Sequence, residues 1–155
     1  AEGAIAAAMA ATDVTLCGTP CLVVGFGRIG KLLAHRLRGL GAEVAVSARR
    51  LDDLAWIDAF GYRGLHTNRL AGTLDDFRVV FNTVPHTVLS EDLLRELPQD
   101  CVLIELASQP GFDRAAAEAL GLKCISALGL PGKAAPETAA RAIWTTLKKI
   151  WEEEA

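Results

Sequence analysis

The chain has 155 residues, of which 51% are hydrophobic and 23% charged, and its formal net charge is −3. This length and composition predict one globular domain with a sizeable buried core. Since the sequence has no block of Lys and Arg, nucleic acid and anionic membranes are not expected as partners, and no apolar run reaches the roughly 20 residues of a membrane-spanning helix.

Apolar runs and helical patterns alternate along the chain. In order, we expect a helix over 2–11, a strand over 22–24, a helix from about 28 to 40, a strand over 43–47, a helix over 52–60 and a weak strand near 62–66. A helical turn between 68 and 74, a strand over 79–84, a helix capped by Ser90, a strand over 102–106, a helix over 113–120 and a strand over 123–127 follow. The last helix spans about 136–151 and is expected to bury Ala139, Ile143, Leu147 and Ile150.

Strands that alternate with helices predict a parallel sheet joined by crossovers. The expected fold class is therefore α/β, a doubly wound six-stranded Rossmann sheet of order 3-2-1-4-5-6 with a long C-terminal helix. In such a sheet the ligand lies at the carboxyl ends of the first and fourth strands.

A glycine motif follows the first strand, where Gly25, Gly27 and Gly30 form the pattern Gly-x-Gly-x-x-Gly. Gly25 allows the tight turn, Gly27 lets the backbone approach a diphosphate, and Gly30 lets the helix lie close to the sheet. The helix that begins near Arg28 brings free N–H groups to the phosphates. We therefore expect a dinucleotide to contact Gly25, Phe26, Gly27, Arg28, Ile29 and Gly30. The alternative is a glycine-rich turn in an unrelated α/β protein.

The residues at the end of the second strand are expected to determine which cofactor binds. NAD-binding domains usually place an acid there, whereas this chain has Ser47, Ala48, Arg49 and Arg50. A hydroxyl donor and two guanidinium groups attract a 2′-phosphate that a carboxylate would repel. The sequence thus predicts NADP(H), with NAD as the alternative if both arginines are solvated.

Three further loops reach the same edge of the sheet. The predicted cofactor contacts there are Asn82, Thr83, Val84 and Pro85 after the fourth strand, Leu106, Ala107 and Ser108 after the fifth, and Pro131 and Gly132 after the sixth. Asn82, Ser108 and Lys133 are the residues expected on the substrate side. The alternatives are that Asn82 belongs to a purely structural strand end and that Lys133 is simply an exposed lysine. Within this edge, Glu105 is interpreted as a structural, hydrogen-bonded carboxylate rather than a general base.

Histidines and cysteines give weaker signals. His35, His66 and His86 are interpreted as structural, and Trp144 and Trp151 as a packing stripe or a subunit interface. The four cysteines include no Cys-x-x-Cys pair, so no metal site is expected and a reduced, cytoplasmic compartment is favoured.

Five stretches together resemble the cofactor domain of the dipicolinate synthase A-subunit family. They are AEGAI…TDVTLCG, VVGFGRIGKLLAHRLRGLGAEVAVSARR, FNTVP, LIELASQPG and ALGLPGKAAPETAAR. The resemblance implies a sporulation oxidoreductase in the mother-cell cytoplasm that works beside the B subunit of dipicolinate synthase. It would oxidise dihydro- or hydroxytetrahydrodipicolinate, a small dicarboxylate, to dipicolinate with NAD(P).

The same resemblance implies a domain arrangement. Residues 1–155 would form one cofactor domain, in which 1–12 is the helix that joins it to an N-terminal substrate domain. We expect this chain alone to bind NADP(H) without turnover and to assemble as a homo-oligomer. The alternatives are the cofactor domain of a hydroxyacid or methylenetetrahydrofolate dehydrogenase, and a nucleotide-sensing Rossmann module without chemistry.

Overall fold

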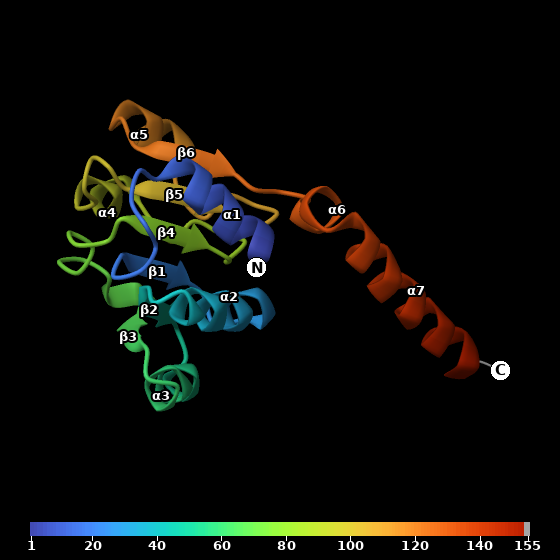
Figure 1. Ribbon diagram of the computed structural model, residues 1–155. Helices are drawn as coiled ribbons and strands as arrows, with labels where there is room; N and C mark the ends of the chain where they lie inside the picture. The colour runs from blue at the N-terminus through green and yellow to red at the C-terminus, as the bar shows by residue number, and fades with distance from the viewer. Residues whose placement is uncertain (154–155) are drawn as a thin grey trace.

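Six parallel strands form one sheet at the centre of the computed structural model, which describes residues 1–153 (Figure 1). The strands are β1 (Pro20–Val24), β2 (Glu43–Ala48), β3 (Arg63–His66), β4 (Val79–Asn82), β5 (Val102–Glu105) and β6 (Lys123–Ser126). Their order in the sheet is β3-β2-β1-β4-β5-β6, and every neighbouring pair is parallel. The predicted doubly wound α/β fold is confirmed.

Helices cover both faces of this sheet (Figure 1). They are α1 (Glu2–Ala11), α2 (Arg28–Gly39), α3 (Leu51–Ala59), the 3-10 turn η1 (Thr67–Arg69), α4 (Glu91–Arg95), α5 (Arg114–Ala119), α6 (Leu130–Ala134) and α7 (Pro136–Glu153). One apolar core contains residues of α1, α2 and α3, and the other contains residues of α4 and α5. None of the described helices is long and apolar enough to cross a membrane.

Strand β1 is apolar on both sides because it lies between these two cores. Cys21 and Val23 face the core that contains α1 and α2, while Leu22 and Val24 face the other core. Burial on both faces explains why the strand reads as a continuous apolar run without alternation. The central position of β1 also places its carboxyl end between those of β2 and β4.

Helix α2 buries a narrower stripe than its sequence suggests. Gly30, Leu33, Ala34 and Leu37 are buried, whereas Ile29, Leu32 and Leu40 are about half exposed. The buried face of the helix is rotated by about one residue from the face that all its apolar residues define. Gly30 allows this, because without a side chain it lies against the β1–α2 turn.

The prediction that α7 buries its apolar stripe is wrong. No residue of α7 is buried, and the helix projects away from the sheet (Figure 1). Periodicity correctly places Ile143, Leu147 and Ile150 on one face, but nothing in the described chain covers that face. The preceding loop also contains an unpredicted turn of helix, α6, which packs on α1 where Gly3 contacts Leu130 and Ala134.

Candidate functional site

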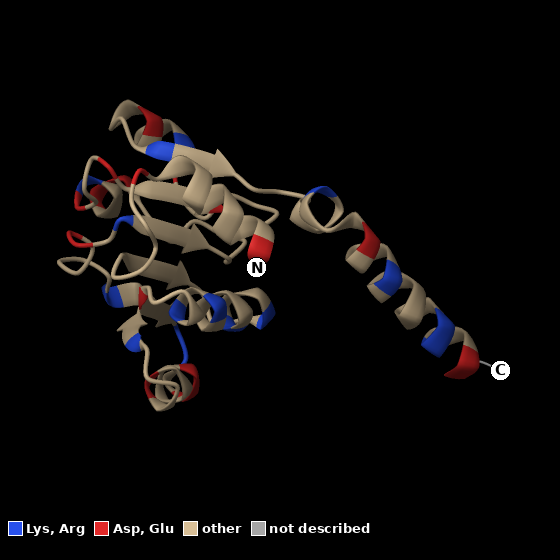
Figure 2. Ribbon diagram, in the orientation of Figure 1, with Lys and Arg blue, Asp and Glu red and all other residues tan. Residues whose placement is uncertain are grey.

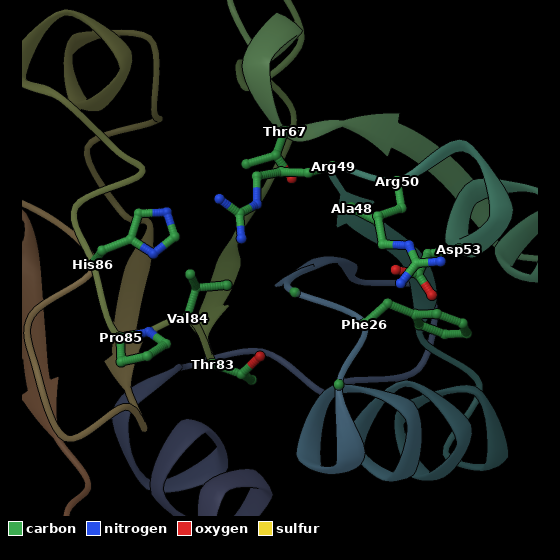
Figure 3. A pocket seen from close by; sticks show the side chains of 12 residues that line it. Phe26, Ala48, Arg49, Arg50, Asp53, Thr67, Thr83, Val84, Pro85 and His86 are labelled. Atoms are coloured by element: carbon green, nitrogen blue, oxygen red, sulfur yellow. The ribbon is translucent and has the colours of Figure 1, made fainter.

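A cleft of about 270 Å³ opens at the carboxyl edge of the sheet, where β1 and β4 lead to opposite faces. Its lining comes from the loops after β1, β2, β3 and β4 (Figure 3). The lining residues are Gly25, Phe26, Gly27, Ala48, Arg49, Arg50, Asp53, Thr67, Thr83, Val84, Pro85 and His86. The cleft thus lies at the point where the strand order reverses, as predicted.

The three glycines of the β1–α2 turn have distinct surroundings. Gly25 has a φ of +101°, a left-handed conformation that favours glycine. At Gly30 a Cβ atom would lie 2.1 Å from the carbonyl oxygen of Gly25, so a side chain there would separate the helix from the turn. A Cβ at Gly27 would meet nothing within 4 Å, which leaves room for a ligand beside the backbone.

The N-terminus of α2 supplies hydrogen-bond donors at this turn. Gly27 is the N-cap, and the first helical hydrogen bond runs from the Lys31 N–H to the Gly27 carbonyl oxygen. The backbone N–H groups of Arg28, Ile29 and Gly30 therefore have no acceptor inside the helix. No acidic residue stands in this first turn, so the positive end of the helix can receive a diphosphate.

Arginine side chains approach the cleft from β2. Figure 3 shows the Arg49 guanidinium pointing into the space between Thr67, Val84 and His86. Arg50 lies on the Asp53 side of the cleft, and its Nη2 atom pairs with Asp52 Oδ2 at 3.0 Å. Of the two predicted cations, only Arg49 is directed into the open space.

Ser47 is placed differently from the prediction. Its side chain is fully buried and accepts a hydrogen bond at 3.3 Å from the Thr67 hydroxyl group. Ser47 lies on the same face of β2 as the buried Ala45, where Thr67 of η1 covers it, so its hydroxyl group does not reach the cleft. It joins β2 to η1 and is absent from the cleft lining.

Asn82 and Glu105 hydrogen-bond each other at the ends of β4 and β5. Asn82 Nδ2 donates to Glu105 Oε1 at 2.6 Å and to the Val84 carbonyl oxygen at 2.9 Å. Glu105 also accepts from the backbone N–H groups of Ala107 and Gly111. The predicted hydrogen bonding of Glu105 is confirmed, and its structural role stays a prediction. The Asn82 side chain donates both amide hydrogens inside the protein instead of presenting them to a substrate.

The other predicted contacts do not converge on the cleft. Ser108 and Ala107 line a separate cavity of about 180 Å³ beside Arg114 and Ser126, and Leu106 packs against the core. Pro131 lines a groove beside α1 and α2, and Gly132 and Lys133 are exposed on α6. The contacts expected from the loop after β6 thus remain predictions. Within the described part of the chain, Pro131, Gly132 and Lys133 are not among the residues that line the cleft.

Two lining residues, Asp53 and Thr67, were missed by the sequence reasoning, and a third, His86, was interpreted as structural. Asp53 stands in the first turn of α3, Thr67 opens η1, and His86 follows Pro85 after β4. A signal for Asp53 and His86 is their position just past the carboxyl ends of β2 and β4. Thr67 gives no such signal, because the strand before it is weakly patterned.

Buried thiols lie away from this site. Burial raises the pKa of the Cys21 thiol to about 12, and burial together with the nearby Asp100 carboxylate raises the pKa of Cys101 to about 12. Both thiols therefore stay protonated near neutral pH. Within residues 1–153 no cluster of three His, Cys, Asp or Glu side chains could hold a metal ion.

Residues 2–116 match the family model of the S-adenosyl-L-homocysteine hydrolase NAD binding domain. The chain belongs to this family. The match covers β1 to β5 and the whole cleft, and together with the α2 N-terminus it makes this an NAD(P)-binding domain of the oxidoreductase type.

The A subunits of two dipicolinate synthases resemble this domain over nearly its full length. The one from Bacillus subtilis (strain 168) is 37% identical over 153 residues, which cover 98% of this chain and 52% of the relative. The crystal structure of the Bacillus halodurans protein has a TM-score of 0.93 at 40% identity and covers 96% of this chain and 52% of its own. The corresponding Bacillus subtilis crystal structure has a TM-score of 0.95 at 37% identity and covers 98% and 51%. The resemblance seen in the sequence is confirmed, and this domain spans about half the length of these relatives.

Proposed function

We propose that this domain binds NADP(H) as the cofactor half of a dipicolinate synthase A subunit. We choose NADP(H) over NAD because the Arg49 guanidinium group lies in the cleft and no acidic residue stands at the end of β2. An adenosine in the cleft would bring its 2′-phosphate beside a fixed, planar cation, which is the arrangement that stabilises a phosphate best. The identity of 37–40% to the two Bacillus relatives supports the choice of enzyme.

NAD is the second candidate, and Asp53 favours it. This carboxylate lines the cleft next to Arg50, where it could accept a hydrogen bond from a ribose 2′-hydroxyl group. The Arg50 side chain is already paired with Asp52, so the choice between NADP(H) and NAD depends on Arg49.

The substitution Arg49→Glu tests the choice. We expect NADPH affinity to fall roughly 10- to 100-fold, the effect of losing one charge-assisted contact, and NADH affinity to change less than about threefold. Lys149→Glu on α7 makes the same change of charge far from the cleft and serves as the control. Calorimetric titration of all three proteins measures the result. An equal loss for both cofactors, or tighter NADH binding by the wild type, would reject NADP(H).

The proposed reaction is the oxidation of a dihydro- or hydroxytetrahydrodipicolinate to pyridine-2,6-dicarboxylate. The oxidised cofactor would supply the acceptor for a hydride from a ring carbon, while a proton leaves to solvent and the hydroxytetrahydro compound first loses water; aromatisation of the product favours the oxidation. The residues of this domain bind and orient the cofactor. The α2 N-terminus holds the diphosphate and Arg49 holds the adenosine phosphate, while the turn at Thr83 and Val84 borders the nicotinamide half. Ser108 and Lys133 stay predictions for the substrate carboxylates.

Three parts of the proposal concern the setting of the reaction. We expect the enzyme to act in the mother-cell cytoplasm of a spore former, beside the B subunit of dipicolinate synthase. The substrate groups would come from a second domain, for which α1 is the connecting helix. Residues 1–155 by themselves should bind cofactor and form no dipicolinate, which an ultraviolet assay of these purified residues measures.

The proposed assembly is a homo-oligomer that pairs through α7. Ile143, Trp144, Leu147, Ile150 and Trp151 are all exposed on this helix, and such a patch is typical of an interface. Acidic and basic residues both occur along α7, with the acids toward its two ends (Figure 2). In an antiparallel pair with a second copy, this apolar face would pack against the same face of the other helix.

A further inference from the structure

The hydrogen-bonded pair of Asn82 and Glu105 is the most deeply buried polar cluster at the carboxyl edge. Asn82 is 1% exposed and Glu105 is 7% exposed, and the two residues are direct neighbours in the β4–β5 register. A buried carboxylate is unfavourable unless donors surround it. Glu105 has three of them: Asn82 Nδ2 at 2.6 Å, the Ala107 N–H at 2.9 Å and the Gly111 N–H at 2.7 Å.

This pair holds two loops. Asn82 fixes the turn after β4 from both sides, since Nδ2 donates to the Val84 carbonyl oxygen and Oδ1 accepts from the Val84 N–H. Glu105 fixes the loop after β5 at both of its ends, Ala107 and Gly111. Gly111 lies directly against the Asn82 amide, because a Cβ there would come within 2.0 Å of Nδ2.

The loop is tied to a third segment as well. The Gly111 carbonyl oxygen accepts hydrogen bonds from the N–H groups of Val88 and Leu89. The Glu105 carboxylate therefore fixes the position of Gly111, and Gly111 in turn fixes the chain that enters α4. Neither Asn82 nor Glu105 lines the dinucleotide cleft itself.

The position of the pair relates it to one half of the cofactor. The glycine turn after β1 takes the diphosphate, and the arginine side of the cleft, next to β2, takes the adenosine. A dinucleotide that crosses the switch point must then place its nicotinamide half over β4 and β5. The turn at Thr83 to Pro85, which borders that half, is the turn that Asn82 holds.

We propose that Asn82 and Glu105 are positioning residues for the nicotinamide half of the cofactor. They hold the turn after β4 and the loop after β5 in place and act through these backbones without touching the ligand. This inference rests on the proposed dinucleotide function. It explains why a carboxylate is buried at this edge although the cleft has no use for it as a base.

Glu105→Gln is the decisive substitution. Its single oxygen can keep the Asn82 and Ala107 donors only if its NH₂ group faces the Gly111 N–H, so the anchor at Gly111 is lost. We expect NADPH affinity to fall roughly tenfold. Affinity for adenosine 2′,5′-bisphosphate, which lacks the nicotinamide half, should stay within about twofold. Glu118→Gln, on the surface of α5, removes the same charge and should change neither.

Asn82→Asp tests the other partner of the pair. The variant keeps the size of the side chain, loses both donations from Nδ2 and sets a second carboxylate against Glu105. The same selective loss of NADPH affinity is expected, again with little change for the bisphosphate. Equal losses for both ligands, or no loss in either variant, would overturn the proposal. If neither variant folds, hydrogen exchange of the wild type decides: NADPH, but not the bisphosphate, must slow exchange at the Gly111 N–H.

Failure of the proposed function gives a different result. In that case the wild-type protein binds neither NADPH nor NADH, before any variant is compared.

Discussion

A methyl group at position 27 should weaken cofactor binding strongly and leave folding intact. Gly27 has φ −80° and ψ −166°, an extended conformation that alanine also adopts. A Cβ at this position meets nothing within 4 Å, so Gly27→Ala should change the free energy of unfolding by less than about 0.5 kcal/mol. Gly30→Ala contrasts with it, because its Cβ would lie 2.1 Å from the Gly25 carbonyl oxygen and should destabilise the fold by about 1–3 kcal/mol.

The loss of binding follows from the space beside Gly27. A Cβ there occupies the volume through which a diphosphate approaches the N–H groups of Arg28 and Ile29. A hydrogen bond to a charged group contributes about 1.5–3 kcal/mol. Losing one of them weakens NADPH binding roughly 10- to 150-fold.

Two measurements on each variant test this reasoning. Calorimetric titration gives the Kd for NADPH, and urea denaturation gives the free energy of unfolding. Gly39→Ala, near the end of α2, is the matched control; it has open space around its Cβ and should stabilise the helix by up to about 1 kcal/mol without affecting binding. A Gly27→Ala protein that is stable and binds NADPH within threefold of the wild type would refute a diphosphate at this turn.

Three further predictions concern the thiols and α7. At pH 8 a thiol reagent should modify the exposed Cys17 and spare Cys21 and Cys101, whose pKa values burial raises to about 12; equal labelling of Cys17 and Cys21 would contradict this. Since the unfolded thiols titrate near 9.0 and the folded ones do not, the free energy of unfolding should fall between pH 9 and 12 by up to about 1.4 kcal/mol per pH unit for each thiol, which denaturation at several pH values measures. Leu147→Glu, within the apolar face of α7, should convert a dimer to a monomer in light scattering, whereas Thr145→Glu on the opposite face should not; a monomeric wild type would contradict pairing with a second copy through this face.

Much of the carboxyl edge could be predicted from the sequence, because strand and helix periods and glycine positions are local properties. The Gly-x-Gly-x-x-Gly turn between a strand and a helix determined where a dinucleotide meets the fold, and it lies there in the structure. Alternation of strands and helices determined the sheet order, since parallel strands need crossovers of one hand. The buried, hydrogen-bonded role of Glu105 was likewise evident from a lone acid inside an apolar run.

Tertiary structure decided the direction of side chains and the partners that cover them. Ser47 lies within β2 and is covered by Thr67 of η1, whereas Arg49 lies just past the end of the strand, where its long side chain reaches the open cleft. The sequence predicts Asn82 as a ligand contact, whereas in the structure its Nδ2 atom donates two hydrogen bonds within the protein. The stripe on α7 has a helical period that fixes which residues share a face, but burial also needs a surface to pack against, and periodicity carries no information about that surface.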